Sequence, residues 1–364
     1  MDPLFEFNAM EEGFWCLYVL LWHRSLYRSV FQSPRFLKQL AEKFEGTSAV
    51  YQYYSNGELK GACFLRNDNG VYHFLSDVKS DHNFFVLRDD CTKEEREEFF
   101  NGLFEKVKEN KLTLMLKNQP AWASYMEEFI NAGKSSKLFV KSSSYSVCPI
   151  LEERSPIDLV ASLNKTTEPR RKAGQLAKKG AALEVYRGNE DLDAWVDQFT
   201  RLHVQRWENT HTPSRYVDAE QRVLLRDCIN AWIEDQVVVR FSLKLGEERI
   251  ALWICLIQGD TLIRHSTTYD ITKHKMSPGK AMIFHVSQWM LENGLTKMDF
   301  GEGAEPYKYE FTNKELNLHQ VLVSSKKNLP FILKSTLREN IHRRMKKSPG
   351  LKKFYYDKIW PLTH

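Results

Sequence analysis

Alternating apolar and polar positions divide the chain into two halves with similar predicted elements. In the first half, three alternating segments separated by Asn- and Gly-containing turns predict a meander of strands over residues 48–54, 59–66 and 71–78. Thr92 suits the N-cap of a charged helix over 93–110, and a strand over 112–116 follows. This half therefore combines antiparallel strands with a helix that leads into a further strand.

The second half repeats this order. Its alternating segments predict strands over residues 237–245, 249–257 and 261–268. An amphipathic helix over about 281–293 and a strand over 297–300 follow them. The residues themselves do not repeat, so we predict a repeat of architecture. The expected fold class is α/β (α+β), with mixed, mainly antiparallel sheets flanked by helices.

Two basic segments mark the boundaries. Residues 163–180 hold six basic residues against one acid, and we place a domain boundary near residue 150. The predicted domains cover 1–150 and 151–325, and a basic helical tail covers 326–364. Such basic segments are commonly solvated; the alternatives are attraction to an anionic acceptor, a membrane surface or tRNA.

Composition narrows the class of protein. The chain has 364 residues, of which 42% are hydrophobic, so it can form sizeable cores, and its net charge of +5 does not by itself indicate nucleic-acid binding. Its six cysteines lack metal-ligand spacing, so we expect reduced thiols and no metal. The apolar run 14–22 is too short to span a membrane, and we expect a cytoplasmic protein.

The most informative stretch lies between residues 260 and 312. Ser277, Pro278, Gly279 and Lys280 predict a helix start that can receive an anion, because Ser suits the N-cap, Pro the first helical position, and Gly lets a phosphate approach the backbone. Lys280 could pair with that phosphate or be solvated. The next strand ends at Asp299, Gly301, Glu302 and Gly303, on the side where α/β sheets place ligands.

Two parts of this stretch resemble the GNAT (Gcn5-related) N-acyltransferase superfamily. Residues 277–283 are similar to its pyrophosphate loop and the following helix, and residues 307–311 are similar to the segment after its splayed fifth strand. The spacing of SPGK, Asp299-Phe300-Gly301 and Tyr307-Lys308 most resembles the CelD/BioF-like branch, which is related to FemAB-type tandem-GNAT transferases. The resemblance covers roughly residues 30–322.

The resemblance implies two tandem GNAT-like domains. The second would hold acyl-CoA through Ser277, Pro278, Gly279, Lys280, Ala281 and Gly301. In the first domain the stretch 77–90 has no Gly-Lys turn, so this copy is expected to bind no CoA and to serve as scaffold and acceptor wall.

The resemblance also implies roles in catalysis. In acyl transfer an amine attacks a thioester, an oxyanion develops and a thiolate leaves. Lys308 could stabilise the oxyanion or orient the donor, and Tyr307 could protonate the thiolate. Glu302 is a candidate base or a surface carboxylate, and His265 a base or a core histidine. The acceptor is expected to contact Arg206, Trp207, Tyr269 and Asp299.

The expected function is an enzyme, an acyl-CoA-dependent N-acyltransferase acting on an amine of an amino sugar, polysaccharide or cell-envelope precursor. Acetyl-CoA is the expected co-substrate, and no metal is expected. Two alternatives stay open: a FemAB-type aminoacyl-tRNA-dependent transferase and a non-catalytic GNAT-fold binding module. The tail could add a peripheral membrane contact at the inner face. Nucleic acid other than a tRNA donor is not expected as a partner.

Overall fold

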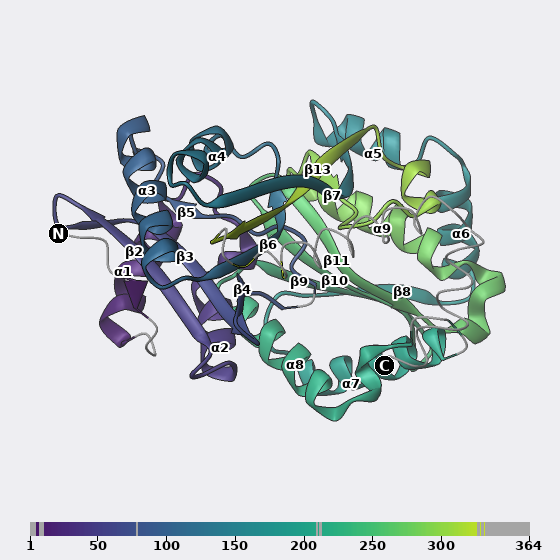
Figure 1. Cartoon of the computed structure of the whole chain (residues 1–364). Coiled ribbons are helices and arrows are strands. Elements are labelled where there is room, and N and C mark those ends of the chain that lie inside the picture. Colours follow the sequence, from purple (N-terminus) through teal and green to yellow (C-terminus); the bar gives the residue numbers. More distant parts are fainter. Residues whose placement is uncertain are drawn as a thin grey trace.

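The computed structural model describes residues 5–6, 11–77, 79–208, 210, 213–325, 328 and 331 (Figure 1). Within these residues, thirteen strands form one sheet that runs through both halves of the chain. Its strand order is β1-β2-β3-β4-β6-β13-β7-β12-β11-β10-β9-β8, and β5 pairs with β3 beside this path. Nearly all of the predicted basic tail, 326–364, lies outside the described residues.

The first half contains the predicted meander. Strands β2, β3 and β4 are antiparallel neighbours, helix α3 follows, and β6 pairs parallel to β4. The bounds in this half are β1 Phe5–Glu6, α1 Glu12–His23, η1 Val30–Gln32, α2 Pro34–Lys43, β2 Ser48–Ser55, β3 Glu58–Asp68, β4 Val71–Phe74, β5 Val86–Leu87, α3 Lys93–Glu109, β6 Thr113–Pro120, α4 Met126–Ser135 and β7 Phe139–Glu152. Thr92 caps α3 as predicted.

The second half repeats the arrangement. Strands β9, β10 and β11 form a second meander, α9 follows, and β12 pairs parallel to β11. The bounds are α5 Pro156–Leu163, α6 Glu168–Ala177, β8 Ala181–Tyr186, α7 Leu192–Trp207, η2 Arg215–Val217, α8 Ala219–Glu234, β9 Val238–Leu245, β10 Glu248–Gln258, β11 Thr261–Tyr269, η3 Ile271–Met276, α9 Pro278–Glu292, β12 Lys297–Asp299, η4 Pro306–Glu310 and β13 Lys314–Ser324. The predicted architectural repeat is confirmed.

Strands β7 and β13 join the two halves. The last described strand, β13, returns from the second half to lie between β6 and β7. β7 pairs with β13 from Phe139 to Ile150 and with β12 from Ile150 to Glu152. The predicted boundary at residue 150 therefore falls inside a strand that both halves share, and the loop after β12 lies beside the first half.

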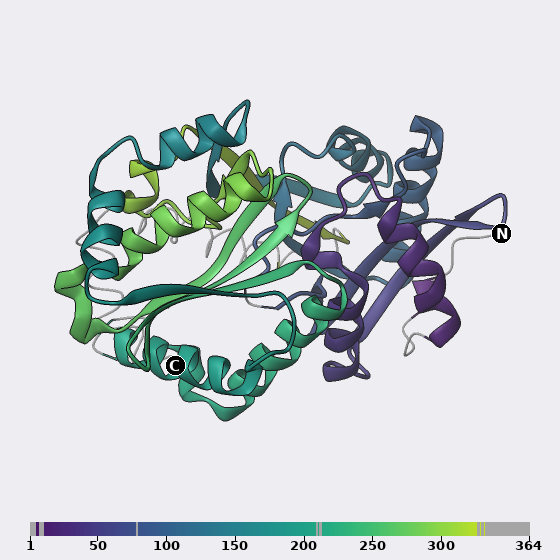
Figure 2. The same ribbon diagram turned by 180° about the vertical axis from the view of Figure 1, so that it is seen from behind.

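Helices cover both faces of the sheet. In the second half α7 and α8 lie on one face and α5, α6 and α9 on the other (Figure 2). The alternation of β-strand side chains separates the cores, because Val50 packs with α1, α2, α7 and α8 while its neighbour Tyr51 packs with α3 and α4. A third core lies under α5, α6 and α9. No helix among the described residues is long and apolar enough to cross a membrane.

Candidate functional site

The parallel strands β11 and β12 separate after three residue pairs. The last pair is Ile263 with Asp299. Beyond this pair β11 continues to Tyr269, whereas the segment after β12 leaves the sheet. At the same level β11 carries a β-bulge, because Arg264 and His265 lie where β10 supplies only Cys255. One edge of β11 beyond Ile263 thus lacks a strand partner among the described residues, and its main-chain groups can meet a ligand.

Helix α9 begins beyond the free end of β11. Ser277 precedes it with φ 53°, Pro278 is its first residue, and its first turn contains no acidic residue. The Ser277 side chain makes no cap hydrogen bond, and a side chain added at Gly279 would meet nothing within 4 Å. This N-terminus is therefore open, and its N–H groups and helix dipole favour an anion.

A second, basic helix lies against this helix start. The Nζ atom of Lys280 donates to Glu168, the first residue of α6, at 2.6 Å and also pairs with Glu310 at 3.7 Å. On the next turn of α6, Lys172 donates to the carbonyl of Lys275 at 3.4 Å. Lys280 is thus engaged by carboxylates, and of the basic residues over 165–179 Lys172 contacts the segment just before α9. Ala281, the residue after Lys280, is buried in the core.

The loop after β12 is held in place by Lys308. Its buried ammonium donates to the carbonyls of Gly301, Glu302 and Gly303 at 2.8, 2.8 and 3.1 Å, and it pairs with Glu305 at 2.9 Å. These contacts satisfy the donors of an ammonium group. Gly301 and Gly303 have φ values of +75° and +110°, which favour glycine. The arrangement gives Lys308 a structural task in addition to the predicted catalytic one.

Asp299 meets two residues of the first half at this loop. Its Oδ2 lies 3.2 Å from Nε2 of His82, and its Oδ1 accepts from the N–H of Gly301 at 2.7 Å. Asp81 accepts from the N–H of Glu302 at 3.1 Å. The carboxylate of Glu302 in turn accepts from Asn118 at 3.1 Å. The predicted residues Asp299 and Glu302 therefore lie in an interface formed with the first half.

Burial and charge set the protonation of this interface. Burial raises the pKa of Asp81 to about 7, and Asp299 acts in the same direction. Burial alone would lower the pKa of His82, but the hydrogen bond and charge of Asp299, together with Asp81, raise it above its ordinary value. Nε2 of His82 is buried and meets Asp299 as an ion pair, with no other hydrogen-bond partner among the described residues. The Asp299–His82 pair thus has the arrangement of an oriented histidine base.

Cys148 completes the buried surroundings of this pair. Its sulfur, one nitrogen of His82 and one oxygen of Asp299 lie within 4.8 Å of one another. Burial raises the pKa of the Cys148 thiol well above its usual range, so it is neutral at physiological pH. Three such atoms are close enough for a metal ion, but both oxygens of Asp299 already have partners within the chain.

The unpaired part of β11 carries an arginine that stacks on aromatic rings. Arg264 is buried, lies over the rings of Trp253, Phe300 and Tyr307, and donates to the Tyr307 hydroxyl at 2.6 Å. Tyr307 itself is 44% exposed. The structure therefore places the predicted Tyr307 at the parting of the strands, where its hydroxyl accepts a charge-assisted hydrogen bond.

The predicted acceptor residues on α7 lie against the same strand. Arg206 stacks on Tyr269 at 4.6 Å and donates to the carbonyl of Thr267 at 3.3 Å. The neighbouring Trp207 has a buried Nε1 without a described partner. His265 instead packs between Phe31 and Trp232, and burial lowers its pKa to about 4, so it is a neutral core residue in this structure.

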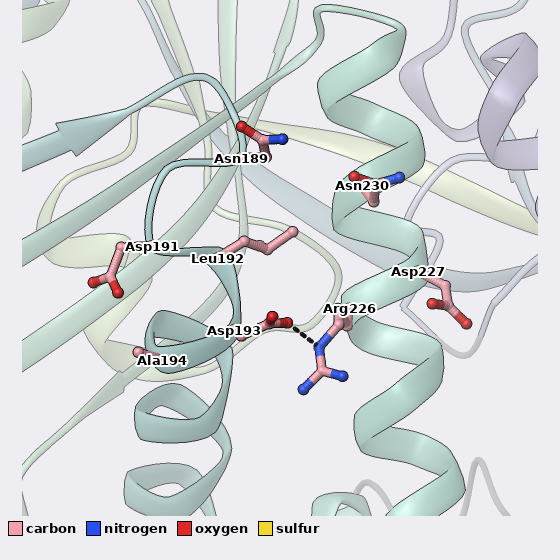
Figure 3. A pocket seen from close by; sticks show the side chains of 8 residues that line it. All are labelled: Asn189, Asp191, Leu192, Asp193, Ala194, Arg226, Asp227 and Asn230. Atoms are coloured by element: carbon pink, nitrogen blue, oxygen red, sulfur yellow. Dashed lines mark ion pairs between the residues drawn. The ribbon is translucent and has the colours of Figure 1, made fainter.

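Two surface cavities lie away from this site. One of about 630 Å³ lies between the start of α7 and α8, where Arg226 pairs with Asp193 (Figure 3). Another, of about 680 Å³, lies between α7, η2 and α8. None of the predicted site residues lines either cavity, so the site rests on the geometry of β11, β12 and α9.

Several residues of the site were missed by the sequence analysis. Asp81 and His82 lie in the stretch 77–90. For this stretch the sequence predicted only that it binds no CoA, because it lacks a Gly-Lys turn. Arg264 and Asn118 carry no local motif at all. No short-range signal pointed to these residues, because their partners are up to 221 positions away in the sequence.

Comparison with known proteins identifies the second half. Residues 164–309 match the family described as an acetyltransferase (GNAT) domain. No curated protein matched the chain by sequence. The second half therefore carries a GNAT domain, and the resemblance of the sequence motifs to the CelD/BioF-like, FemAB-related branch is confirmed.

Solved structures extend the likeness to the whole fold. FemX matches with a TM-score of 0.60 at 10% identity, covering 84% of this chain and 95% of FemX. L-PGS from Bacillus licheniformis matches with a TM-score of 0.60 at 12% identity, covering 91% and 97%. A tandem GNAT protein from the clavulanic acid biosynthesis pathway matches with a TM-score of 0.50 at 9% identity, covering 88% and 97%. The chain thus has the tandem GNAT fold and carries a GNAT-fold acyltransferase domain.

Proposed function

We propose that the chain is an acyl-CoA-dependent N-acyltransferase that transfers an acetyl group to an amine of an amino sugar, polysaccharide or cell-envelope precursor. The observation that supports it best is the parting of β11 and β12 at a β-bulge, followed along the chain by the open N-terminus of α9. A thioester can lie along the unpaired edge of β11 while its phosphates meet α9 and the basic face of α6.

The first step of the transfer would use the interface between the halves. The acceptor amine attacks the thioester carbonyl, and the C–N bond forms as the proton of the amine passes to His82. Asp299 orients the imidazole and stabilises the imidazolium that results. Main-chain N–H groups at the bulge of β11 are candidates to stabilise the oxyanion.

The second step releases the thiolate. The C–S bond breaks, and the CoA thiolate takes up a proton, for which the half-exposed Tyr307 is our candidate donor. Its hydroxyl accepts from Arg264, which also stabilises the phenolate left behind until solvent restores the proton. Glu302 is the weaker candidate base, because Asn118 already binds its carboxylate.

Calorimetric titration of the whole chain with acetyl-CoA tests the donor. We expect one site per chain, because among the described helices only α9 presents an open start after a parted strand pair. An absence of binding at millimolar acetyl-CoA, with a cooperative unfolding transition that shows an intact fold, would contradict the CoA-dependent reaction. Transfer to glucosamine, followed by release of free thiol, tests the acceptor class.

Aminoacyl-tRNA is the alternative donor. The similarity to FemX over most of both chains favours it, since FemAB-type relatives use this donor. Tight tRNA binding that falls steeply with salt concentration, together with no binding of acetyl-CoA, would support this alternative.

A further inference from the structure

Two arginines at the parting of the strands lack a carboxylate partner. Neither Arg206 nor Arg264 forms an ion pair with any acidic side chain in the described part of the chain. Arg264 is only 9% exposed, and Arg206 is half-buried at the end of α7. Burial lowers the pKa of Arg206, and the charge of Arg264 acts in the same direction. The two arginines are thus cations that act on each other, an arrangement that a bound anion would stabilise.

Unused hydrogen-bond donors surround the same place. Nε of Arg264 and Nε1 of Trp207 are buried and have no partner among the described residues. On the neighbouring η2, Nε and Nη1 of Arg215 are likewise unused, although this arginine pairs with Asp77 of the first half at 3.6 Å. Buried donors are usually hydrogen-bonded, so these groups are available to a polar ligand.

The two arginines approach the edge of β11 from different elements. Arg206 belongs to α7, which packs on the sheet face opposite α9, and it contacts β11 at Thr267 and Tyr269. Arg264 stacks on Trp253 and Phe300, which belong to the core under α9, and the half-exposed Tyr307 lies beside it. A ligand held by both arginines would thus lie at the unpaired edge of β11, while the donor phosphates would meet the start of α9.

We propose that Arg206 and Arg264 form an anion site that binds a phosphate or carboxylate group of the acceptor. The assignment of this site to the acceptor rests on the proposed function, whereas the binding of an anion rests on the two arginines. Guanidinium groups suit such ligands, because their planar donors match the oxygens of phosphate and carboxylate in pairs. The acceptor would thus be an amine that also carries an anionic group, such as a sugar phosphate or an amino acid.

Titration with inorganic phosphate at constant ionic strength tests the anion site without a known acceptor. We expect the unaltered chain to bind phosphate, and Arg206→Gln and Arg264→Gln each to bind at least about tenfold more weakly. Arg187→Gln is the matched control, since Arg187 also stacks on an aromatic ring, Trp289, but is exposed and remote from the site. Equal phosphate binding by all four proteins, or none by the unaltered chain, would overturn the proposal.

Two further measurements test whether the variants fold and whether the bound anion belongs to the acceptor or to CoA. We expect Arg206→Gln to unfold at no lower temperature than the unaltered chain, because it removes a repulsion; it keeps the test valid if Arg264→Gln fails to fold. Phosphate binding that persists in saturating acetyl-CoA supports an acceptor site, whereas displacement assigns the arginines to the phosphates of CoA and overturns the acceptor assignment. If acetyl-CoA does not bind but phosphate still binds through the two arginines, the proposed function fails and the anion site stands.

Discussion

The two halves of the sheet differ at the corresponding strand and helix start. In the second half, β11 is nine residues long and continues past a bulge to Tyr269, and α9 begins without a side-chain cap. In the first half, β4 ends after four residues, and the chain leaves the sheet before returning as β5 beside Gly61 and Ala62 of β3. The helix that follows, α3, is closed by a capping box in which Thr92 and Glu95 bond to each other's main chain.

This difference shows how one architecture serves two purposes. An acidic first turn with its donors already bound repels an anion, whereas an open one attracts it, so only α9 suits the phosphates of a donor. The excursion between β4 and β5 delivers Asp81 and His82 to the loop after β12. The first half thus supplies side chains to the loop that follows β12 in the second half.

Replacing His82 should have the largest effect on transfer. If the first half supplies the base, His82→Gln reduces turnover by about 10²- to 10⁴-fold and leaves acetyl-CoA binding unchanged. Release of free thiol with glucosamine as acceptor measures turnover, and calorimetric titration measures acetyl-CoA binding. His73→Gln is the control, because His73 is a half-buried histidine of the same half that bonds to the main chain of Met115. Unaltered turnover in His82→Gln would restrict the first half to a scaffold.

Replacing Lys308 separates its structural task from a chemical one. Lys308→Met leaves three buried carbonyls without their donor and should lower the free energy of unfolding by about 3 kcal/mol. Urea unfolding measures this, with Lys314→Met as a control, since the exposed pair of Lys314 with Glu152 contributes at most about 1 kcal/mol. A Lys308→Met protein that is fully stable and loses only turnover would show that the ammonium acts on the reaction.

Asp81 should make stability depend on pH. Burial raises its pKa to about 7 from the 3.8 of an ordinary aspartate, so between these values the folded protein keeps a proton that the unfolded chain releases. Stability therefore falls as pH rises through this range. Between pH 4 and pH 8 the unaltered chain should lose on the order of 2 kcal/mol of unfolding free energy that Asp81→Asn keeps. This figure allows for the joint titration of Asp81 and His82. Parallel pH profiles of unfolding for the two proteins would contradict the burial of this carboxyl.

Replacing Gly279 tests whether the N-terminus of α9 receives the phosphates of acetyl-CoA. Gly279→Glu gives this helix an acid in its first turn, as in α3, and should weaken acetyl-CoA binding at least about tenfold, or roughly 1.4 kcal/mol. The site has room, since nothing lies within 4 Å of an added Cβ, and Gly279→Ala is therefore a neutral control. Equal affinities of the Glu and Ala variants would place the phosphates elsewhere.

The two helix caps give the smallest expected difference. Thr92→Ala should cost about 1 kcal/mol in unfolding free energy, because the Thr92 hydroxyl accepts from the N–H of Glu95. Ser277→Ala should cost almost nothing, since the Ser277 side chain makes no such bond. Chemical unfolding of both variants compares them directly. A similar loss in each would mean that α9 is capped in solution and less open than its geometry indicates.

Local patterns in the sequence determined the elements and their order. The turns before Leu59 and Val71, the cap at Thr92 and the Pro278 helix start each depend on neighbouring residues, so they could be predicted together with the repeat. The proposed donor end of the site could also be predicted, because its Gly, Pro and Lys residues are contiguous along the chain.

The tertiary structure alone decided what faces the donor end. Asp81, His82, Asn118, Arg206 and Arg264 come there from four separate segments, and no local pattern records a pairing between residues so far apart. It also decided that Lys308 holds a loop, that His265 lies in a core, and that β13 returns between β6 and β7. Each of these outcomes depends on packing and on the satisfaction of buried polar groups, which exist only once the two halves share one sheet.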